Sequence, residues 1–358
     1  MTAKALPPGS VIGIMGGGQL GRMLALAAGQ LGLKCHIYAP EADSPAFHVS
    51  AAHTVAGYRD EAALARLAAV VDVVTYEFEN VPVEAVRFLE PRVPVRPGAK
   101  ALEVAQDRLN EKSLARELGA RTAEFAAVNS LADLEAAVAQ IGLPAILKTT
   151  RLGYDGKGQA KIMTPADVPA AWSAMKGSAS ILESFVNFER EVSVIAARGV
   201  DGTFAAFDVT ENVHRNHILH TSTVPAQVSP ALAAEAVGIA RRFLERLDYV
   251  GVMGVEFFLG KDAIYVNEIA PRVHNSGHWT QDACTVSQFQ QHIRAVAGWP
   301  LGDTARHSDV VMTNLLGDEI HAWQELVREP RLALHHYGKT EARPGRKMGH
   351  VNRMKPRA

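Results

Sequence analysis

The sequence predicts an α/β unit with a parallel sheet, followed by α+β structure in which the sheets are mainly antiparallel. Strand and helix patterns alternate over residues 11–95, which is typical of a parallel sheet covered by helices. An apolar strand at 145–148 runs into a glycine-rich segment, and longer strands follow one another from residue 189. We therefore expect three domains, over residues 1–119, 120–188 and 189–358.

In the first domain, the apolar run 11–15 ends in Gly16-Gly17-Gly18-Gln19-Leu20-Gly21, and apolar residues at helical spacing continue to Gly32. This order predicts a strand, a glycine turn and a helix. The other elements expected here are strands at 35–38 and 72–76 and helices at 61–70, 83–89 and 107–118.

The second domain is small, and its glycine-rich segment favours a mobile lid. We expect a helix at 131–141 and strands at 145–148 and 179–183. The third domain contains longer strands and fewer helices. The elements expected there are strands at 191–197, 203–209, 252–259 and 263–269 and helices at 231–247 and 285–296.

Composition excludes several classes of protein. The 358 residues are 47% hydrophobic and 21% charged, which is ordinary for a globular protein. With 37 basic and 38 acidic residues there is no overall charge for binding nucleic acid or a membrane surface, although residues 339–357 are locally basic. The two cysteines, Cys35 and Cys284, lack metal-ligand spacing and suit a reducing compartment. Without a long apolar run, we expect a soluble cytoplasmic protein.

The most informative segment is Gly153-Tyr154-Asp155-Gly156-Lys157-Gly158-Gln159, which lies just after the strand that ends in Lys148. Glycines let backbone N–H groups approach phosphate oxygens, and the lysine supplies positive charge. No Gly-Lys-Ser/Thr sequence begins a helix here, so the segment differs from a P-loop. It predicts a lid over nucleotide phosphates, and the alternative is a surface hairpin rich in turn residues.

The turn at 16–21 satisfies the G-x-G-x-x-G pattern of dinucleotide-binding proteins. Tyr38 and Ala39 stand where a nicotinamide-binding protein would place an acidic residue for the ribose hydroxyls. The same turn can instead hold a phosphate or carboxylate at the helix N-terminus, or simply allow close helix–strand packing. A nicotinamide-dependent oxidoreductase is therefore kept as an alternative of another class.

Glu256 and Glu268 flank a predicted turn at residues 260–262. If Leu259 pairs with Tyr265, the two glutamates lie opposite each other on one face of a hairpin. Two carboxylates in apolar surroundings repel unless a cation lies between them or they share a proton. Magnesium that bridges nucleotide phosphates suits such a pair, whereas solvated hairpin glutamates are the alternative.

In this order, the strand lysine, the glycine lid and the paired carboxylates resemble the ATP-grasp superfamily. More narrowly, the chain resembles the N5-carboxyaminoimidazole ribonucleotide synthetase family of purine biosynthesis, from near residue 10 to its end. The blocks that carry this resemblance are residues 16–23, 76–81, 106–108, 153–159, 267–279 and 343–350. The resemblance implies an ATP-grasp fold: a Rossmann-like pre-ATP-grasp domain, a small mobile lid domain and a C-terminal antiparallel-sheet domain. It also implies a homodimer.

The reaction implied by the resemblance is the ATP-dependent carboxylation of 5-aminoimidazole ribonucleotide by bicarbonate, through carboxyphosphate, with release of ADP and phosphate. By the same resemblance, Glu256 and Glu268 would hold Mg²⁺, which neutralises charge during phosphoryl transfer. Besides residues 153–159, the residues implied at ATP are Arg108, Lys148, Glu183, Phe185, Val186, Glu191, His214, Asn267 and Glu268.

Arg272, His274, Asn275 and Ser276 form a polar group that could receive bicarbonate, with Arg272 gripping its planar oxygens. A buried ion pair is the alternative for Arg272. Tyr154 and Asp155 are implied next to the aminoimidazole. The residues implied at the ribonucleotide are Lys339, Arg346 and Lys347 at its phosphate, and Gln19, Leu20, Glu77 and Asn80 from the first domain. For the three basic residues, a solvated tail is the alternative.

One position departs from the superfamily, which commonly has Asn two residues after the second metal glutamate. Here that residue is Ala270. Strand alternation would place Asn267 on the face opposite Glu268, so the ligand set of a second magnesium is left open. An ATP-grasp formyltransferase that uses formate and glycinamide ribonucleotide remains the nearest alternative function.

Overall fold

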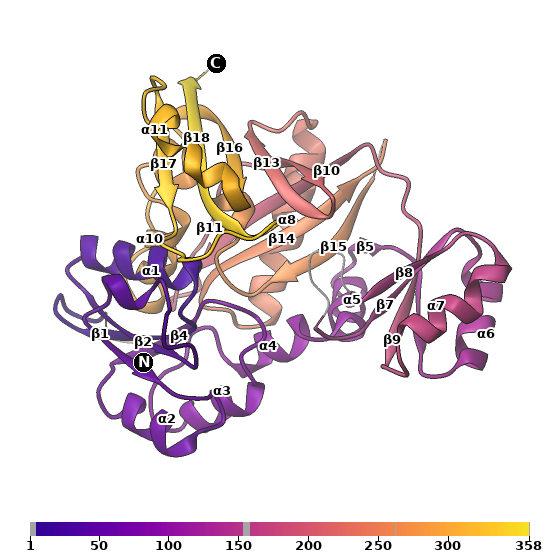
Figure 1. Cartoon of the computed structure of the whole chain (residues 1–358), viewed down its shortest axis with the longest axis horizontal. Helices are drawn as coiled ribbons and strands as arrows, with labels where there is room; N and C mark the ends of the chain where they lie inside the picture. The colour runs from indigo at the N-terminus through magenta and orange to yellow at the C-terminus, as the bar shows by residue number, and fades with distance from the viewer. Residues whose placement is uncertain (1–4, 153–157, 262, 358) are drawn as a thin grey trace.

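The computed structural model describes residues 5–152, 158–261 and 263–357, which form three sheets with their covering helices (Figure 1). The first sheet has the order β3-β2-β1-β4 and is parallel. Its strands are β1 (Val11–Met15), β2 (Lys34–Ala39), β3 (Ala52–Val55) and β4 (Val73–Tyr76). Its helices are α1 (Gln19–Gln30), α2 (Glu61–Ala68), α3 (Val83–Leu89) and α4 (Ala99–Ala105).

The strand, glycine turn and helix predicted for residues 11–31 are present as β1 and α1. Strand β3 was not predicted, because it is an exposed edge strand without the apolar run used as a signal. Helix α5 (Arg108–Glu117) then leads toward the second sheet, and Gly119 follows it with a φ of +73°, which explains the glycine at this position.

The second sheet, β6-β9-β7-β8, is antiparallel. Leu147 and Leu182 belong to a hydrophobic core that this sheet shares with two helices. Figure 1 shows the unit projecting from one end of the molecule. Its strands are β6 (Phe125–Val128), β7 (Ala145–Thr149), β8 (Gln159–Ile162) and β9 (Ser180–Ser184), and its helices are α6 (Leu131–Ile141) and α7 (Val168–Ala174).

The third sheet has ten strands in the order β17-β18-β16-β13-β12-β10-β14-β15-β5, with β11 paired to β10. Most neighbours are antiparallel, whereas β5 pairs parallel with β15. The strands are β5 (Arg121–Thr122), β10 (Arg190–Arg198), β11 (Phe204–Ala206), β12 (Thr210–Arg215), β13 (Ile218–Val224), β14 (Gly251–Leu259), β15 (Ile264–Ala270), β16 (Ser308–Leu316), β17 (Leu332–His336) and β18 (Lys347–Pro356).

The strand expected at 203–209 is wrong in extent, because only Phe204–Ala206 is a strand. The hairpin of β12 and β13 that follows was missed, since its side chains on the site side are polar rather than apolar. The opposite face of the sheet packs on α8 (Pro230–Arg246) through residues such as Val192, Val255 and Phe257.

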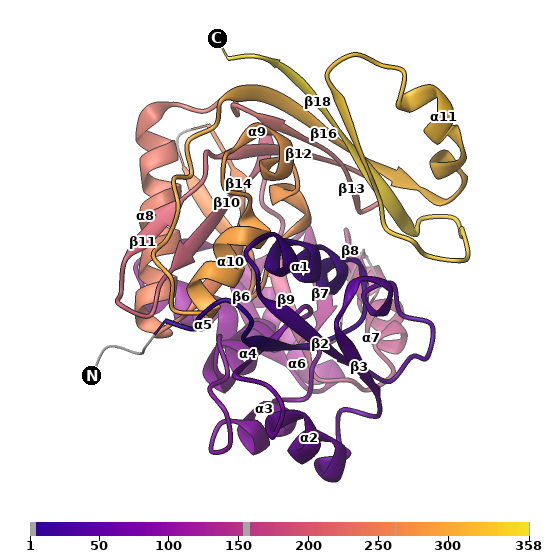
Figure 2. The same cartoon turned by 90° about the vertical axis from the view of Figure 1, so that its left-hand side faces the viewer.

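The largest hydrophobic core joins the first sheet to the third. It includes Ile12 and Leu24 together with Val252 and Trp279. Helix α1 packs against α10 (Gln288–Val296), and Figure 2 shows these two helices next to each other. The chain therefore has one continuous core across the expected boundary at residue 119, and the three-domain division remains a prediction.

None of the helices in the described part of the chain combines the length and apolar character needed to cross a bilayer. Cys35 and Cys284 are both buried free thiols, as expected of packed core residues. Burial raises the pKa of each thiol to about 12, so neither is a thiolate at neutral pH.

Candidate active site

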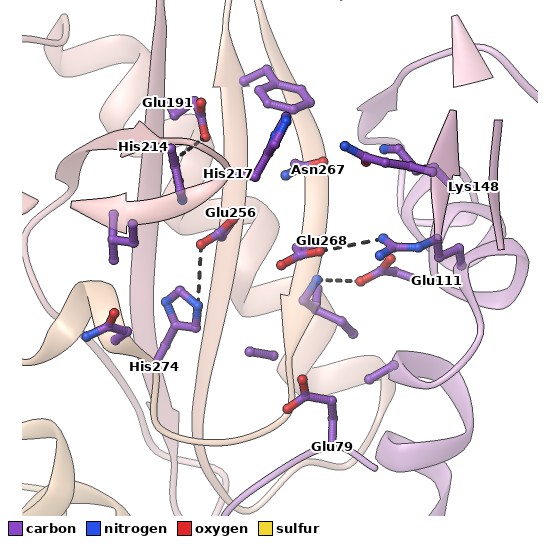
Figure 3. Close-up of a pocket in the computed structure, with 18 of the residues that line it drawn as sticks. Glu79, Glu111, Lys148, Glu191, His214, His217, Glu256, Asn267, Glu268 and His274 are labelled. Atoms are coloured by element: carbon purple, nitrogen blue, oxygen red, sulfur yellow. Dashed lines mark hydrogen bonds and ion pairs between the residues drawn. The ribbon is translucent and has the colours of Figure 1, made fainter. Parts of the chain in front are cut away.

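A cavity of about 730 Å³ lies where the second sheet, α5 and the third sheet meet (Figure 3). Because strands β10, β14 and β15 are antiparallel neighbours, residues opposite one another on them share a face of the sheet. The predicted site residues that line the cavity are Asn80, Arg108, Lys148, Gln159, Phe185, Glu191, His214, Glu256, Asn267, Glu268, Arg272, His274, Asn275 and Lys347.

Lys148 on β7 is held by a buried carboxylate. Its Nζ lies 2.8 Å from Oε2 of Glu183, and the Nζ of Lys112 lies 3.9 Å from Oε1 of the same residue. Glu183 is only 2% exposed. Burial disfavours its charge, but the two ammonium groups outweigh burial and lower its pKa to about 2. The adenine-side acid predicted at this position is thus ionised and shared by two lysines.

Lys112 was missed by the sequence analysis. It lies on α5, is 1% exposed, and donates to the backbone carbonyls of Val266 at 3.2 Å and Asn267 at 2.7 Å. Its neighbour Glu111 accepts the backbone N–H of Ile269, and burial raises the pKa of Glu111 to about 8. Glu111 and Lys112 both lie on the buried side of α5. A charged residue on the buried side of a predicted helix is the signal that could have identified them, because charged side chains are rarely fully buried unless they are paired.

Glu256 and Glu268 lie opposite each other on β14 and β15, as predicted (Figure 3). The register nearer the turn differs from the expectation, since Leu259 pairs with Ile264 rather than Tyr265. A β-bulge after Glu256 corrects the difference of one residue. Burial and the nearby Glu268 raise the pKa of Glu256 to about 7, as expected for two carboxylates without a cation between them.

The bulge also corrects the expected orientation of Asn267. Val266 and Ile269 both pack in the hydrophobic core beneath the sheet. The two residues between them, Asn267 and Glu268, consequently both line the cavity (Figure 3). The expectation that Asn267 faces away from Glu268 is therefore wrong, because simple alternation fails where a strand contains an extra residue.

Arg108, at the first turn of α5, brings a cation to this carboxylate pair. Its guanidinium Nη1 lies 3.6 Å from Oε2 of Glu268. Asp107 caps the helix by accepting the backbone N–H of Leu109 at 3.0 Å, which fixes the turn that presents Arg108. The predicted phosphate-contacting arginine and the predicted metal carboxylate thus meet in the same cavity.

His214 and Glu191 form a second ion pair at the other edge of the cavity. Nδ1 of His214 lies 2.8 Å from Oε2 of Glu191 (Figure 3). Burial alone would lower the pKa of His214, but the Glu191 carboxylate outweighs it and the net shift is upward. Phe185 is 48% exposed and lines the cavity after β9, and Val186 follows it.

Arg272 pairs with Glu79, a residue that the sequence analysis did not select. Nε of Arg272 donates to Oε2 of Glu79, and the arginine side chain is 16% exposed. The ion-pair alternative for Arg272 is therefore present, and its role at bicarbonate remains a prediction. His274 contacts Glu256 through Nε2 at 3.3 Å, and burial lowers the pKa of His274 well below its usual value.

The glycine turn of the first sheet receives an anion from within the protein. Glu77 is 7% exposed and accepts the backbone N–H groups of Gly18 and Gly21, each at 2.6 Å. Gly16 has a φ of +114°, and a Cβ there would lie 2.2 Å from Cγ of Glu77, so only glycine fits. Leu20 is buried beside this turn, and Gln19 begins α1.

Two of the three basic residues near the C-terminus, Lys339 and Arg346, are not among the residues that line the cavity. Lys339 donates to the backbone carbonyl of Lys347 at 2.7 Å, and Arg346 donates to that of Glu341 at 2.8 Å. Burial and the neighbouring Arg346 lower the pKa of Lys339 to about 8, although Glu77 opposes this shift. Lys347 lines the cavity.

Two further predicted residues lie beside His274. The side-chain amides of Asn275 and Asn314 bond each other, at 3.0 and 2.8 Å. Ser276 has no exposed surface and bonds His274 and Ser193 instead of lining the cavity.

Of the predicted glycine-rich lid, five residues lie outside the described residues: Gly153, Tyr154, Asp155, Gly156 and Lys157. Gly158, whose carbonyl accepts the N–H of Thr149 at 2.8 Å, leads into β8.

Three family models match consecutive parts of the chain. Residues 10–106 match the ribonucleotide synthetase preATP-grasp domain, and residues 113–289 match the ATP-grasp domain. Residues 310–358 match the phosphoribosylaminoimidazole carboxylase C-terminal domain. The fold and the site geometry thus agree with an ATP-grasp enzyme that acts on a ribonucleotide.

A full-length relative decides the family. The N5-carboxyaminoimidazole ribonucleotide synthase of Brucella melitensis is 54% identical over 360 residues, covering 100% of this chain and 99% of the relative. The chain belongs to the N5-carboxyaminoimidazole ribonucleotide synthase family. The synthase of Bacillus subtilis is 43% identical, with 99% of this chain and 94% of the relative covered.

Solved structures of N5-carboxyaminoimidazole ribonucleotide synthase family members have the same fold. An ADP complex superposes with a TM-score of 0.95 at 44% identity, covering 99% of this chain and 94% of the other. The Aspergillus clavatus enzyme in complex with ADP and 5-aminoimidazole ribonucleotide superposes with a TM-score of 0.91 at 32% identity, covering 98% and 94%. The predicted family and the predicted ATP-grasp fold are confirmed.

Proposed function

We propose that this protein carboxylates 5-aminoimidazole ribonucleotide with ATP and bicarbonate, giving N5-carboxyaminoimidazole ribonucleotide, ADP and phosphate. The observation that carries this proposal is the meeting of Lys148, Arg108 and the Glu256–Glu268 pair in one cavity of a chain from this family. Cations and carboxylates in this arrangement suit a nucleotide whose terminal phosphoryl group is transferred.

ATP lies along the cavity in this proposal. Phe185 and Val186 contact adenine, Glu183 orients Lys148, and Glu191 with His214 meets the ribose. Lys148 and Arg108 provide the charge for the phosphates. Support comes from the two ion pairs on either side of the cavity, Lys148 with Glu183 and His214 with Glu191. Gly158 and Gln159 approach the phosphates, and residues 153–157, assigned to the same role from the sequence, lie outside the described residues.

The carboxylate pair fits Mg²⁺. Magnesium takes one or two carboxylates together with substrate phosphates, so it needs no dedicated cluster of protein ligands. Among the described residues no group of three or more His, Cys, Asp or Glu side chains could hold a metal, whereas Glu256 and Glu268 face each other across the hairpin. Bound there, Mg²⁺ would neutralise charge on the phosphates.

The chemistry then needs two displacements. A bicarbonate oxygen attacks the γ-phosphorus of ATP, and ADP leaves, which gives carboxyphosphate. The exocyclic amine of the ribonucleotide attacks the carboxyl carbon, the C–O bond to phosphate breaks, and the amine loses a proton. Carboxyphosphate reacts readily with water, so closure of the site protects it.

Arg272 and His274 are proposed at bicarbonate, with Asn275 beside them and Ser276 behind His274. The ribonucleotide lies toward the first sheet, where Glu77, Gln19, Leu20 and Asn80 approach its ribose and Lys339, Arg346 and Lys347 approach its phosphate. Tyr154 and Asp155 meet the aminoimidazole. Support comes from Asn80, Arg272 and Lys347, which line the same cavity.

The test is to incubate the protein with Mg²⁺, ATP and 5-aminoimidazole ribonucleotide and to measure ADP release with bicarbonate, with formate, or with neither. Release that depends on bicarbonate and on the ribonucleotide supports the proposal. Formate dependence with glycinamide ribonucleotide would favour the formyltransferase instead. A homodimer is proposed from the family resemblance, and a cytoplasmic location from the two cysteines and the lack of a long apolar run in the sequence. Sedimentation of the purified protein in an analytical ultracentrifuge tests the homodimer.

A further inference from the structure

A chain of buried hydrogen bonds crosses three strands behind His274. The hydroxyl of Ser222 on β13 donates to Oδ1 of Asn212 on β12 at 2.8 Å, and the Asn212 amide donates to Ser193 on β10 at 2.9 Å. The hydroxyls of Ser193 and Ser276 lie 2.7 Å apart, and that of Ser276 lies 2.8 Å from Nδ1 of His274. Asn212 is 5% exposed and the three serines are fully buried.

The direction of these hydrogen bonds follows from a backbone group. The N–H of Ser276 points to Nδ1 of His274 at 3.3 Å. A backbone N–H can only donate, so Nδ1 must present a lone pair and the neutral ring carries its proton on Nε2. Nε2 is the nitrogen that faces Glu256 at 3.3 Å (Figure 3).

The other end of this series of hydrogen bonds, at Asn212, independently gives the same direction of donation toward His274. The Asn212 amide donates to Ser193, so the one hydroxyl proton of Ser193 is available for Ser276. The proton of Ser276 is then available for Nδ1 of His274. The hydroxyls of Ser193 and Ser276 each accept one bond and donate one in this arrangement, and no two donors face each other.

The backbone of His274 is fixed as firmly as its ring. Gln288 is fully buried, accepts the N–H of His274 at 2.9 Å and donates to its carbonyl at 2.7 Å. Gly254 lies under the side chain, and a Cβ at that position would be 2.7 Å from Cβ of His274. The imidazole therefore has little freedom to turn its other nitrogen toward the cavity.

We propose that Asn212, Ser193 and Ser276 are positioning residues that hold His274 as the Nε2–H tautomer, so that His274 offers the active site a hydrogen-bond donor and not a base. This inference rests on the proposed function, in which bicarbonate and the transferred phosphoryl group are anions near Glu256. A neutral donor fits such a site because it stabilises oxyanions without a lone pair directed at them. In this state His274 does not accept the proton that the amine releases.

The tautomer can be measured directly. Nitrogen-15 NMR of protein labelled at histidine distinguishes a protonated ring nitrogen from an unprotonated one, and a His274→Gln variant identifies the signals of His274. We expect an unprotonated Nδ1 and a protonated Nε2 in the wild-type protein. A protonated Nδ1 with an unprotonated Nε2 would overturn the inference.

Asn212→Asp should reverse the direction of these hydrogen bonds. A carboxylate can only accept a hydrogen bond, so the hydroxyl of Ser193 would donate to it. The hydroxyl proton of Ser276 would then turn toward Ser193. We expect signals of an Nδ1–H tautomer at His274, a kcat at least about tenfold lower, and an unchanged KM for ATP. Ring signals and a kcat identical to wild type would contradict the role of Asn212.

Ser193→Ala interrupts the chain without adding a charge, and so guards against a variant that fails to fold. We expect a mixture of His274 tautomers and an intermediate loss in kcat. The matched control is Ser180→Ala, which removes a buried serine hydroxyl bonded to Ser178 O at 2.8 Å, outside this chain. It should keep both the ring signals and kcat.

The two proposals fail in different ways. If the wild-type protein shows the Nε2–H tautomer but ADP release does not depend on bicarbonate, the proposed function is overturned and the assignment of the tautomer stands. If release depends on bicarbonate while His274 shows the other tautomer, the proposed function stands and the positioning role is overturned.

Discussion

The carboxylate of Glu77 accepts the backbone N–H of Gly21 at 2.6 Å, at the N-terminus of α1. In dinucleotide-binding proteins a helix N-terminus after such a glycine turn holds the pyrophosphate. Here the second oxygen of Glu77 also accepts the N–H of Gly18. The anion site suggested by the G-x-G-x-x-G pattern is therefore filled by a side chain of the protein itself.

We predict that the protein does not bind NADH, since Glu77 would repel a pyrophosphate and would have to leave Gly18 and Gly21. Titration should leave the fluorescence of NADH unchanged, while ADP binds under the same conditions. Saturable binding of NADH that ADP does not displace would contradict this prediction and revive the oxidoreductase alternative.

Binding of Mg²⁺ and ADP should release protons near neutral pH. The pKa of Glu256 is raised to about 7 from its usual value of 4.5, so without metal the folded protein keeps this proton until the pH approaches 7. Metal binding requires the carboxylate. Affinity should therefore increase as pH rises from 6 to 8, and calorimetry in buffers of different ionisation enthalpy should show proton release at the lower pH.

Glu256→Gln should abolish that proton release and most turnover while leaving the fold intact. Glu268→Ala should likewise abolish turnover. Normal rates in either variant at limiting Mg²⁺ would contradict the assignment of the metal ligands.

Acid should destabilise the protein partly through His292. Its Nδ1 accepts the backbone N–H of Val252 at 3.0 Å, and its Nε2 bonds Thr75 at 2.8 Å. Burial lowers its pKa to about 3. Below pH 6.5 the unfolded chain takes up a proton that the folded protein refuses, so stability falls from pH 6.5 down to 3, by up to about 4 kcal/mol.

Urea unfolding at several pH values measures this effect. His292→Gln should be less stable than wild type at pH 7 and should show a shallower loss between pH 7 and 5. His278 and His350 also have lowered pKa values, so the difference between the two slopes is the readout. Parallel slopes would show that His292 is charged in the folded state.

Lys112→Met should lower the free energy of unfolding by about 3 kcal/mol, because it leaves the buried carboxylate of Glu183 with only one of its two cations. Adding Glu183→Gln should restore part of the loss, which a double-mutant cycle by urea unfolding detects. Lys100→Met on α4 is the control, since Lys100 is exposed and should change stability by no more than about 0.5 kcal/mol.

Lys339→Ala should raise the KM for the ribonucleotide much more than that for ATP. The pKa of Lys339 is lowered to about 8, so its positive charge is lost as pH rises through 8 and the wild-type KM for the ribonucleotide should rise there. Lys355→Ala, an exposed lysine on β18, is the matched control. An unchanged KM in the Lys339 variant would remove this residue from the phosphate site.

The parts of the site that could be predicted from sequence lie within short segments. Lys148 lies near the end of an apolar strand, and Glu256 and Glu268 flank one hairpin, so local pattern alone predicts the lysine and the facing carboxylates. The first sheet was predictable for the same reason, because β1 and β4 are apolar runs and the strands alternate with helices.

Contacts between distant segments were out of reach. Lys112 meets Glu183 from another unit, and Glu79 meets Arg272 across 193 positions of sequence. The bulge that turns Asn267 into the cavity depends on pairing between strands, which a single strand's alternation does not reveal. The β12–β13 hairpin escaped detection because polar residues such as Asn212 and Ser222 occupy positions where apolar ones were sought.

The core shared by the first and third sheets has a consequence for assembly of the native state. Ile12 and Leu24 share a hydrophobic core with Val252 and Trp279, which are synthesised more than two hundred positions later. The N-terminal segment of the nascent chain therefore keeps apolar surface exposed to water until these later segments have been synthesised. Truncation before residue 252 should yield insoluble material, even though the α/β pattern of the first sheet is locally complete.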